Sequence, residues 1–262
     1  MENIQRQNLK ISGSGSAGGG LYDEVKISGS GKINGDVDCN EFHISGSGRL
    51  EGNLKCEDFK TSGSSKVVGD IVGGEVKVSG SSNIDGNVNV KIFGVSGSAH
   101  VEKDLKAREL RVSGSSNING NVNADSVEIS GSISVKGDCE SESFSARGGF
   151  NIGGLLNAGN IDIRVGGKCT AKEIGGETIK VRESNDGLFA LNKVFKALFL
   201  GHCGCLNTDV IEGDDIYIEY TNAKIVRGNR VVVGKGCVIE TVEYKENLNI
   251  EGDGKVNNQV RL

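Results

Sequence analysis

The sequence predicts an all-β protein, a parallel β-helix with 17 residues per coil and one short helical insertion. The phrase Ser-Gly-Ser recurs along the first half of the chain, and its glycine returns every 17 residues from Gly29 to Gly131. Between these glycines the apolar residues stand two positions apart, which is the spacing of strands and not of helices. Seventeen residues hold three short strands with tight turns, whereas a crossover helix would need a dozen or more residues of its own.

Four apolar columns appear when the repeats are aligned. They begin at Val25, Ile27, Ile33 and Val37 and continue with Val, Ile, Leu, Phe or an occasional Thr or Cys at each step of 17. We expect these columns to point inward and to stack on themselves about 4.8 Å per coil. Burying four or five such side chains, at roughly 1.5–3 kcal/mol each, supports a coil that cannot stand alone.

Two glycine columns predict the corners of each coil. Ser-Gly-Ser lies where the wall bends, because small residues let neighbouring coils approach. The second corner is predicted six residues later, where a left-handed backbone is free only for glycine. Its residues are Gly35, Gly52, Gly69, Gly86, Gly120 and Gly137. A phosphate-binding loop would open a helix and would not recur in every coil, so we interpret both columns as turn chemistry.

The outward columns are polar and patterned. After the second corner Asp alternates with Asn, in the order Asp36, Asn53, Asp70, Asn87, Asp104, Asn121 and Asp138. Asn between two carboxylates removes the repulsion of like charges about 4.8 Å apart. On another face acidic residues precede basic ones by two positions, as Glu24, Glu41, Asp58, Glu75 and Glu109 precede Lys26, His43, Lys60, Lys77 and Arg111. Two interpretations stand, a solvated and self-neutralised wall or a lateral docking face for another filament.

The pattern divides the chain into an N-terminal tail (1–8), a main β-helix block (9–186), an amphipathic helix with a Cys-containing loop (187–205) and C-terminal β-helix coils (206–262). In the last part Ile216, Val233 and Ile250 are 17 residues apart, as are Ile239 and Val256. This spacing predicts further coils and leaves open whether they stack on the main block or form a second one.

The segment 185–205 is the one helix-like stretch. Its apolar residues share one face at helical spacing, namely Leu188, Leu191, Phe195, Leu198 and Phe199. Asn185 or Asp186 is a suitable N-cap, and Gly201 a suitable end. Three roles are open: it packs on the β-helix flank or caps an open end, it contacts a membrane surface, or it joins subunits. The polar face is weakly basic for a membrane helix.

Composition excludes several classes of protein. The net charge is −5 with no basic stripe, which argues against a nucleic-acid partner. No run of 18 apolar residues exists, so no spanning helix is expected. Seven cysteines without a secretory signal indicate a reducing compartment. We therefore expect a cytoplasmic protein, with a peripheral position at the inner face of the membrane as a second location.

No pattern predicts a catalytic residue, a cofactor or a metal. His202, Cys203 and Cys205 offer soft ligands in one loop, but zinc takes four and no second pair follows at a familiar distance. The three histidines have no recurring Ser or Asp partner that would make a triad. Cys39 and Cys56 share an inward column on adjacent coils, where the Cα separation permits a disulfide, although a cytoplasm favours free thiols.

Two enzyme classes built on β-helices fit poorly. Acyltransferases repeat hexapeptides, which gives about 18 residues per coil, and need a catalytic His on a loop. Polysaccharide lyases and hydrolases carry long loops with acidic clusters over a groove, and residues 22–150 leave no room for such an insertion. An enzyme acting on envelope sugars or acyl groups is thus the weakest hypothesis.

The repeats resemble those of the bactofilins, polymer-forming cytoskeletal proteins of bacteria. VSGSSNINGNV (112–122) is similar to their recurring coil. GGGLYDEVKISGSGKINGDV (18–37) and IEGDDIYIEYTNAKIVRGNRVVVGKGC (211–237) look like a longer Gram-positive branch of that family. The resemblance implies a right-handed β-helix that assembles end to end without nucleotide, sometimes at the membrane, as a scaffold for cell shape or envelope enzymes. The inserted helix and the second repeat block depart from the compact family pattern.

The leading hypothesis is a non-enzymatic scaffold that self-assembles through its β-helix ends into cytoskeleton-like polymers. Terminal coils expose unpaired strand edges and apolar rungs, which must be capped or paired with another molecule. The predicted assembly interface comprises Leu9, Ile11 and Tyr22 of the first coil and Leu248, Ile250 and Val256 of the last. Its partner is the protein itself, followed by a membrane surface or envelope-associated proteins. The alternative is a capped, non-polymeric binding or adaptor module.

Overall fold

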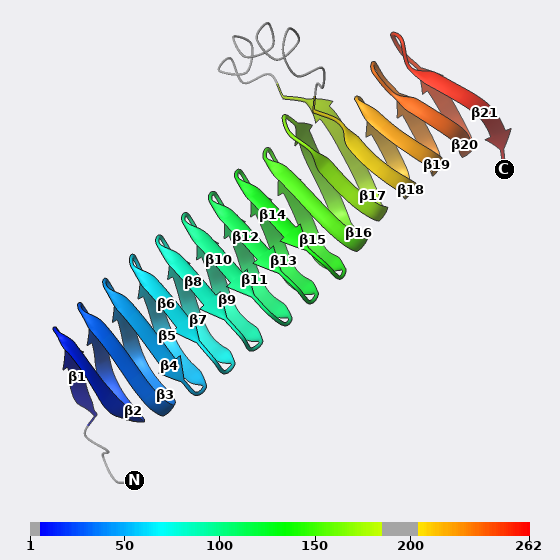
Figure 1. Ribbon diagram of the computed structural model, residues 1–262. Coiled ribbons are helices and arrows are strands. Elements are labelled where there is room, and N and C mark those ends of the chain that lie inside the picture. The colour runs from blue at the N-terminus through cyan, green and yellow to red at the C-terminus, as the bar shows by residue number, and fades with distance from the viewer. Residues whose placement is uncertain (1–5, 185–203) are drawn as a thin grey trace, which may run out of the picture. The chain divides into compact units, whose positions relative to one another are not determined.

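The computed structural model describes residues 6–184 and 204–262 (Figure 1). All elements in these residues are strands, and each described strand pairing is parallel. The predicted all-β parallel β-solenoid is confirmed. Contacts divide the chain into two compact units, residues 1–124 and 125–262. Among the described residues there is no helix long and apolar enough to cross a bilayer.

Long strands open the first unit, and shorter ones of four to eight residues follow. They are β1 (Gln7–Ile11), β2 (Ser14–Ile27), β3 (Ser30–Ile44), β4 (Ser47–Glu51), β5 (Leu54–Thr61), β6 (Ser64–Val67), β7 (Ile71–Val78), β8 (Ser81–Ile84), β9 (Val88–Val95), β10 (Ser98–Val101), β11 (Leu105–Val112) and β12 (Ser115–Ile118). Strand β13 (Val122–Ile129) includes the boundary between the units.

The second unit has longer strands that bend around the coil. They are β14 (Ser132–Val135), β15 (Cys139–Ala146), β16 (Gly149–Val165), β17 (Cys169–Glu183), β18 (Leu206–Ile218), β19 (Thr221–Val233), β20 (Val238–Ile250) and β21 (Lys255–Arg261). The predicted helix at 187–201 lies outside the described residues. The strands on either side of it, β17 and β18, pair in parallel, with Ile174 opposite Ile211 and Ile179 opposite Ile216. The coils after residue 204 therefore stack directly on those before it.

The 17-residue step is the register of the first unit. Phe42 lies opposite Phe59, and Ser98 lies between Ser81 and Ser115. In the second unit the step varies, because Ile216 lies opposite Val231 and Ile218 opposite Val233. The predicted pairing of Ile216 with Val233 is therefore wrong, since this coil is two residues shorter than the repeat. The predicted partners Val233 and Ile250, and Ile239 and Val256, are correct.

The core consists of the four predicted columns, and every member from the first coils to Leu156 is buried. Two further columns of small residues also point inward. One contains Gly31, Gly48, Ser65, Ser82, Ala99, Ser116, Ile133 and Phe150, and the other contains Cys39, Cys56, Gly73, Val90, Ala107, Ala124, Ser141 and Ala158. Small side chains here fill the space that the large columns leave.

Close stacking explains the Ser-Gly-Ser corner, as predicted. A Cβ added at Gly63 would overlap the carbonyl oxygen of Gly46, and one at Gly80 would overlap that of Gly63. The same carbonyls accept hydrogen bonds from the next coil, with Ser64 N to Gly46 O at 2.9 Å and Ser81 N to Gly63 O at 2.9 Å.

At the second corner the predicted cause is wrong for most of the column. Gly35 has a positive φ of 104°, but Gly52, Gly69, Gly86 and Gly120 do not. A Cβ at Gly69 would instead overlap the Oδ1 atom of Asn53 and the backbone of Gly52. Glycine is needed here because the coils and their turn side chains stack too closely for any Cβ.

Candidate functional site

The free strand edges of the terminal coils are the first candidate site. Strand β1 covers only the second half of β2, so residues 14–21 pair with β3 alone among the described residues. Strand β21 pairs with residues 238–244 of β20, which leaves residues 247–250 paired with β19 alone in the described chain. Each terminal coil thus presents backbone N–H and C=O groups that have no strand partner on one side.

The predicted interface residues lie on these edges. Leu9 and Ile11 of β1 lie opposite Val25 and Ile27, and both are half-buried, whereas their neighbours one coil further in are fully buried. Tyr22 lies on β2, where its hydroxyl donates to the Gly18 carbonyl at 2.9 Å. It belongs to the second strand and not to the outermost one.

The last coil is the more apolar of the two edges. Leu248 and Val256 are half-buried, and Ile250 is 39% exposed. Val238, Val260 and Leu262 add further apolar surface at 51%, 43% and 60% exposure. Together these make four of the six exposed large apolar residues in the described chain, so apolar exposure concentrates on β20, β21 and the terminal residue.

The charged wall of the first unit neutralises itself. Acidic and basic residues two positions apart contact each other, as in Lys77 with Glu75 at 2.8 Å and Lys60 with Asp58 at 3.4 Å. His43 Nε2 lies 2.9 Å from Glu41, and these two with Glu24 place their ligand atoms within 4.8 Å of one another. Because this trio belongs to the ion-pair ladder and is largely exposed, we assign it no metal.

The alternating Asp and Asn column is a hydrogen-bond ladder. Each side-chain oxygen accepts the backbone N–H of the equivalent residue one coil later. The bonds run from Asn53 N to Asp36 Oδ1 (2.7 Å), Asp70 N to Asn53 Oδ1 (2.9 Å), Asn87 N to Asp70 Oδ1 (2.7 Å), Asp104 N to Asn87 Oδ1 (3.3 Å) and Asn121 N to Asp104 Oδ1 (2.8 Å). The column stabilises the corners, because both residue types supply the required acceptor.

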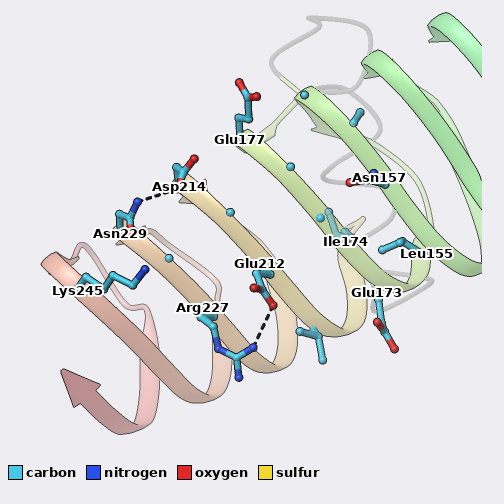
Figure 2. A pocket seen from close by; sticks show the side chains of 17 residues that line it. Leu155, Asn157, Glu173, Ile174, Glu177, Glu212, Asp214, Arg227, Asn229 and Lys245 are labelled. Atoms are coloured by element: carbon cyan, nitrogen blue, oxygen red, sulfur yellow. Dashed lines mark hydrogen bonds and ion pairs between the residues drawn. The ribbon is translucent and has the colours of Figure 1, made fainter. Parts of the chain in front are cut away.

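A groove of about 700 Å³ crosses several coils of the second unit (Figure 2). A column of in-register glycines, Gly176, Gly213 and Gly228, contributes to its lining, and Tyr244 is the next residue in that column. A Cβ at Gly176 would overlap the Ala158 carbonyl, and one at Gly213 would overlap the Gly176 carbonyl. These glycines serve close stacking of the coils, as in the first unit.

Paired charges line the groove. Arg227 donates to Glu212 at 3.0 Å and to Glu243 at 2.6 Å, and Asn229 donates to Asp214 at 2.7 Å, as two of the dashed lines in Figure 2 show. The residues that line it include no His, Cys, Ser, Thr or Tyr. The described groove therefore lacks a nucleophile with a neighbouring base, which acyl or glycosyl transfer would need.

The remaining sequence candidates are only partly described. His202, Cys203 and the five apolar helix residues Leu188, Leu191, Phe195, Leu198 and Phe199 lie outside the described residues. Cys205 is half-buried and its thiol accepts a hydrogen bond from Asn207 Nδ2 at 3.3 Å. Burial raises the pKa of the Cys139 thiol to about 12 and that of Cys237 to about 11, so these two are core thiols.

Comparison with known proteins identifies the repeat. A family model described as "Bactofilin: Polymer-forming cytoskeletal" matches residues 3–89 and 72–157, more than half of the chain. The chain belongs to the bactofilin family. This is a structural and non-enzymatic family, in agreement with the absence of a catalytic pattern from the sequence.

Two relatives from Bacillus subtilis (strain 168) share one part of this bactofilin. The protein "Uncharacterized protein YhbF" is 36% identical over 91 residues, which are 35% of this chain and 34% of the relative. "Uncharacterized protein YhbE" is 35% identical over 96 residues, 37% of this chain and 38% of the relative. The matched part thus spans little more than a third of each relative's length. No solved structure matches the chain significantly.

Proposed function

We propose that this bactofilin is a scaffold that self-assembles end to end, through the free edges of its first and last coils, without nucleotide. The observation that carries the proposal is the half-covered terminal coil at each edge. Interior strands have parallel partners on both sides, but residues 14–21 and 247–250 have one on a single side within the described chain. A second copy can supply the missing partner and extend the same parallel ladder.

Apolar rungs add a driving force to these backbone hydrogen bonds. Inward positions that are fully buried in the interior are only half-buried at Leu9, Ile11, Leu248 and Val256, and Ile250 is more exposed still. Covering them with another coil removes apolar surface from water, at about 25 cal/mol per Å². This contribution does not depend on charge, so assembly should persist at physiological salt.

The corner chemistry supports assembly without nucleotide. The amides around each Ser-Gly-Ser are engaged in the coil-to-coil ladder, with Ser47 N bonded to Gly29 O at 2.8 Å and Ser45 N to Ile27 O at 2.9 Å. Such amides cannot form the open cradle that binds phosphate. A cytoplasmic location, with contact to the inner membrane surface or envelope-associated proteins, is the setting we propose for the polymer.

Sedimentation velocity of edge variants tests the interface. Ile11→Lys on the first edge and Val256→Lys on the last each place a charge where the proposed contact is apolar. Val72→Lys is the matched control, because Val72 is 46% exposed and lies on β7, in the interior of the first unit. We expect both edge variants to lose large assemblies and the control to keep them.

The size of the remaining species separates two geometries. If unlike edges meet, either variant leaves monomers, whereas contacts between like edges leave dimers joined through the unmodified edge. Assemblies unaffected by both edge variants would contradict the proposal. A wild-type protein that stays monomeric at every concentration would favour the alternative, a capped binding or adaptor module.

A further inference from the structure

Two thiols lie in contact inside the first unit. Cys39 of β3 and Cys56 of β5 are in-register neighbours on adjacent coils, and the Cys39 thiol donates to Cys56 Sγ at 3.3 Å. Both are free cysteines and both are buried, at 3% and 4% exposure. In-register parallel neighbours have Cα atoms about 4.8 Å apart with side chains on the same face, which lies within the range of disulfides.

The surroundings hold the pair reduced but leave it reachable. The hydrogen bond with Cys56, followed by burial, raises the pKa of the Cys39 thiol, so the two sulfurs can lie together without charge repulsion. The Cys56 thiol contacts the carbonyl oxygen of Asp58 at 3.1 Å. Both cysteines border a surface hollow of about 520 Å³, and their column continues with Gly73, which has no side chain to cover Cys56.

We propose that Cys39 and Cys56 form a reversible oxidation site, a cross-coil disulfide made by a peroxide. One thiol loses its proton and attacks the peroxide oxygen, which gives a sulfenic acid and releases the first water. The second thiol attacks that sulfur and releases the second water, so one S–S bond forms while two S–H bonds and the O–O bond are lost. The sulfurs must approach from 3.3 Å to roughly 2 Å, which a side-chain rotation can supply.

Peptide mapping of the oxidised full-length protein tests the site. The folded protein is treated with hydrogen peroxide, alkylated in denaturant without reductant and digested with trypsin. Cys39 then lies in peptide 33–49 and Cys56 in peptide 56–60, and neither contains another cysteine. We expect these two peptides to appear joined, two hydrogen atoms lighter than their sum, and to separate after dithiothreitol. Cys139, which lies opposite Leu156, should remain alkylated in the same sample.

A variant and a size measurement complete the test. Cys56→Ser should abolish the joined peptide and leave Cys39 alkylated, with unchanged circular dichroism showing that the fold persists. The joined peptide must also come from single chains on a non-reducing gel. The proposal is overturned if Cys39 and Cys56 stay separately alkylated or oxidised in the folded protein, or if they link only to cysteines of other chains.

Discussion

Glycines at the Ser-Gly-Ser corner are required by contact and not by backbone conformation. No positive φ occurs at Gly46, Gly63 or Gly80, yet a Cβ at each would overlap the carbonyl oxygen of the glycine one coil earlier. The contacted atom is backbone, which cannot move without opening the coil-to-coil hydrogen bonds. The repeating glycine is therefore the residue-scale cause of the 17-residue rhythm.

Gly63→Ala should destabilise the fold strongly, by about 1–3 kcal/mol or more, because the methyl group overlaps Gly46 O and lies 2.6 Å from Ser45 O. The matched control is Gly94→Ala, whose methyl group would meet only Val76 O at 3.8 Å and Lys77 Cγ at 3.9 Å. We expect the control to change stability by less than about 0.5 kcal/mol. Urea unfolding followed by circular dichroism measures both, and equal losses would refute the contact explanation.

One carboxylate near the N-terminal edge should contribute to acid sensitivity. The hydrogen bond from Lys55, assisted by Arg6, holds the pKa of Asp38 below its usual value of 3.8. A depressed folded-state pKa gives stability that is present above the unfolded value and is lost as pH falls through the folded value. The contribution should therefore disappear on acidification below about pH 3.8.

Melting temperatures across the acid range test this carboxylate. The difference between the wild type and Asp38→Asn should be largest near neutral pH and shrink below about pH 3.8. Lys55→Met, which leaves the carboxylate but removes its main partner, should narrow the same difference. A difference that stays constant from neutral to acid pH would contradict the assignment.

At the scale of elements, the Asp and Asn ladder links each coil to the next. Asn53 accepts the Asp70 N–H at 2.9 Å, and it lies between two carboxylates, those of Asp36 and Asp70. Asn53→Ala should cost about 0.5–1.5 kcal/mol at any salt concentration, since it removes the acceptor. Asn53→Asp keeps the acceptor but creates three adjacent carboxylates, so its cost should be large at low salt and fall as salt screens the repulsion.

Thermal melts at low salt and at about 1 M salt separate the two effects, because the screening length falls to roughly 3 Å at the higher concentration. Recovery by Asn53→Asp alone would support the ladder. The same salt response in both variants would show that the alternation does not act through charge.

The large columns were predictable from the sequence, and the small ones were not. Val, Ile, Leu and Phe two positions apart are a strong strand pattern, whereas Gly48, Ser65 and Ala99 carry no signal of burial although they point inward. They complement the neighbouring large column. Gly48 lies against Ile44, and Phe150 is in the same strand column only where Ala146 replaces the larger residue.

Coil length in the second unit was also beyond the sequence pattern. The 17-residue spacing of Ile216 and Val233 is a coincidence, because a shorter turn shifts the register and places Val231 opposite Ile216. Local spacing cannot separate a shortened corner from a regular one when both neighbours are β-branched. The edge residues, in contrast, follow directly from being first and last in their columns.

At the scale of the whole molecule, both terminal edges lack a partner for one half-coil in the described residues. Such edges are covered in natural β-proteins or used for pairing. Their apolar rungs predict contacts that salt does not weaken, and their backbone groups predict a continued parallel ladder. The scaffold account therefore depends on these two surfaces and not on the self-neutralised walls.

Negative-stain electron microscopy of the purified full-length protein, without nucleotide, tests this account most directly. Samples at low and at physiological salt should both contain filaments, because the proposed contacts are apolar rungs and backbone hydrogen bonds. Monodisperse single particles under both conditions would contradict end-to-end assembly of this chain.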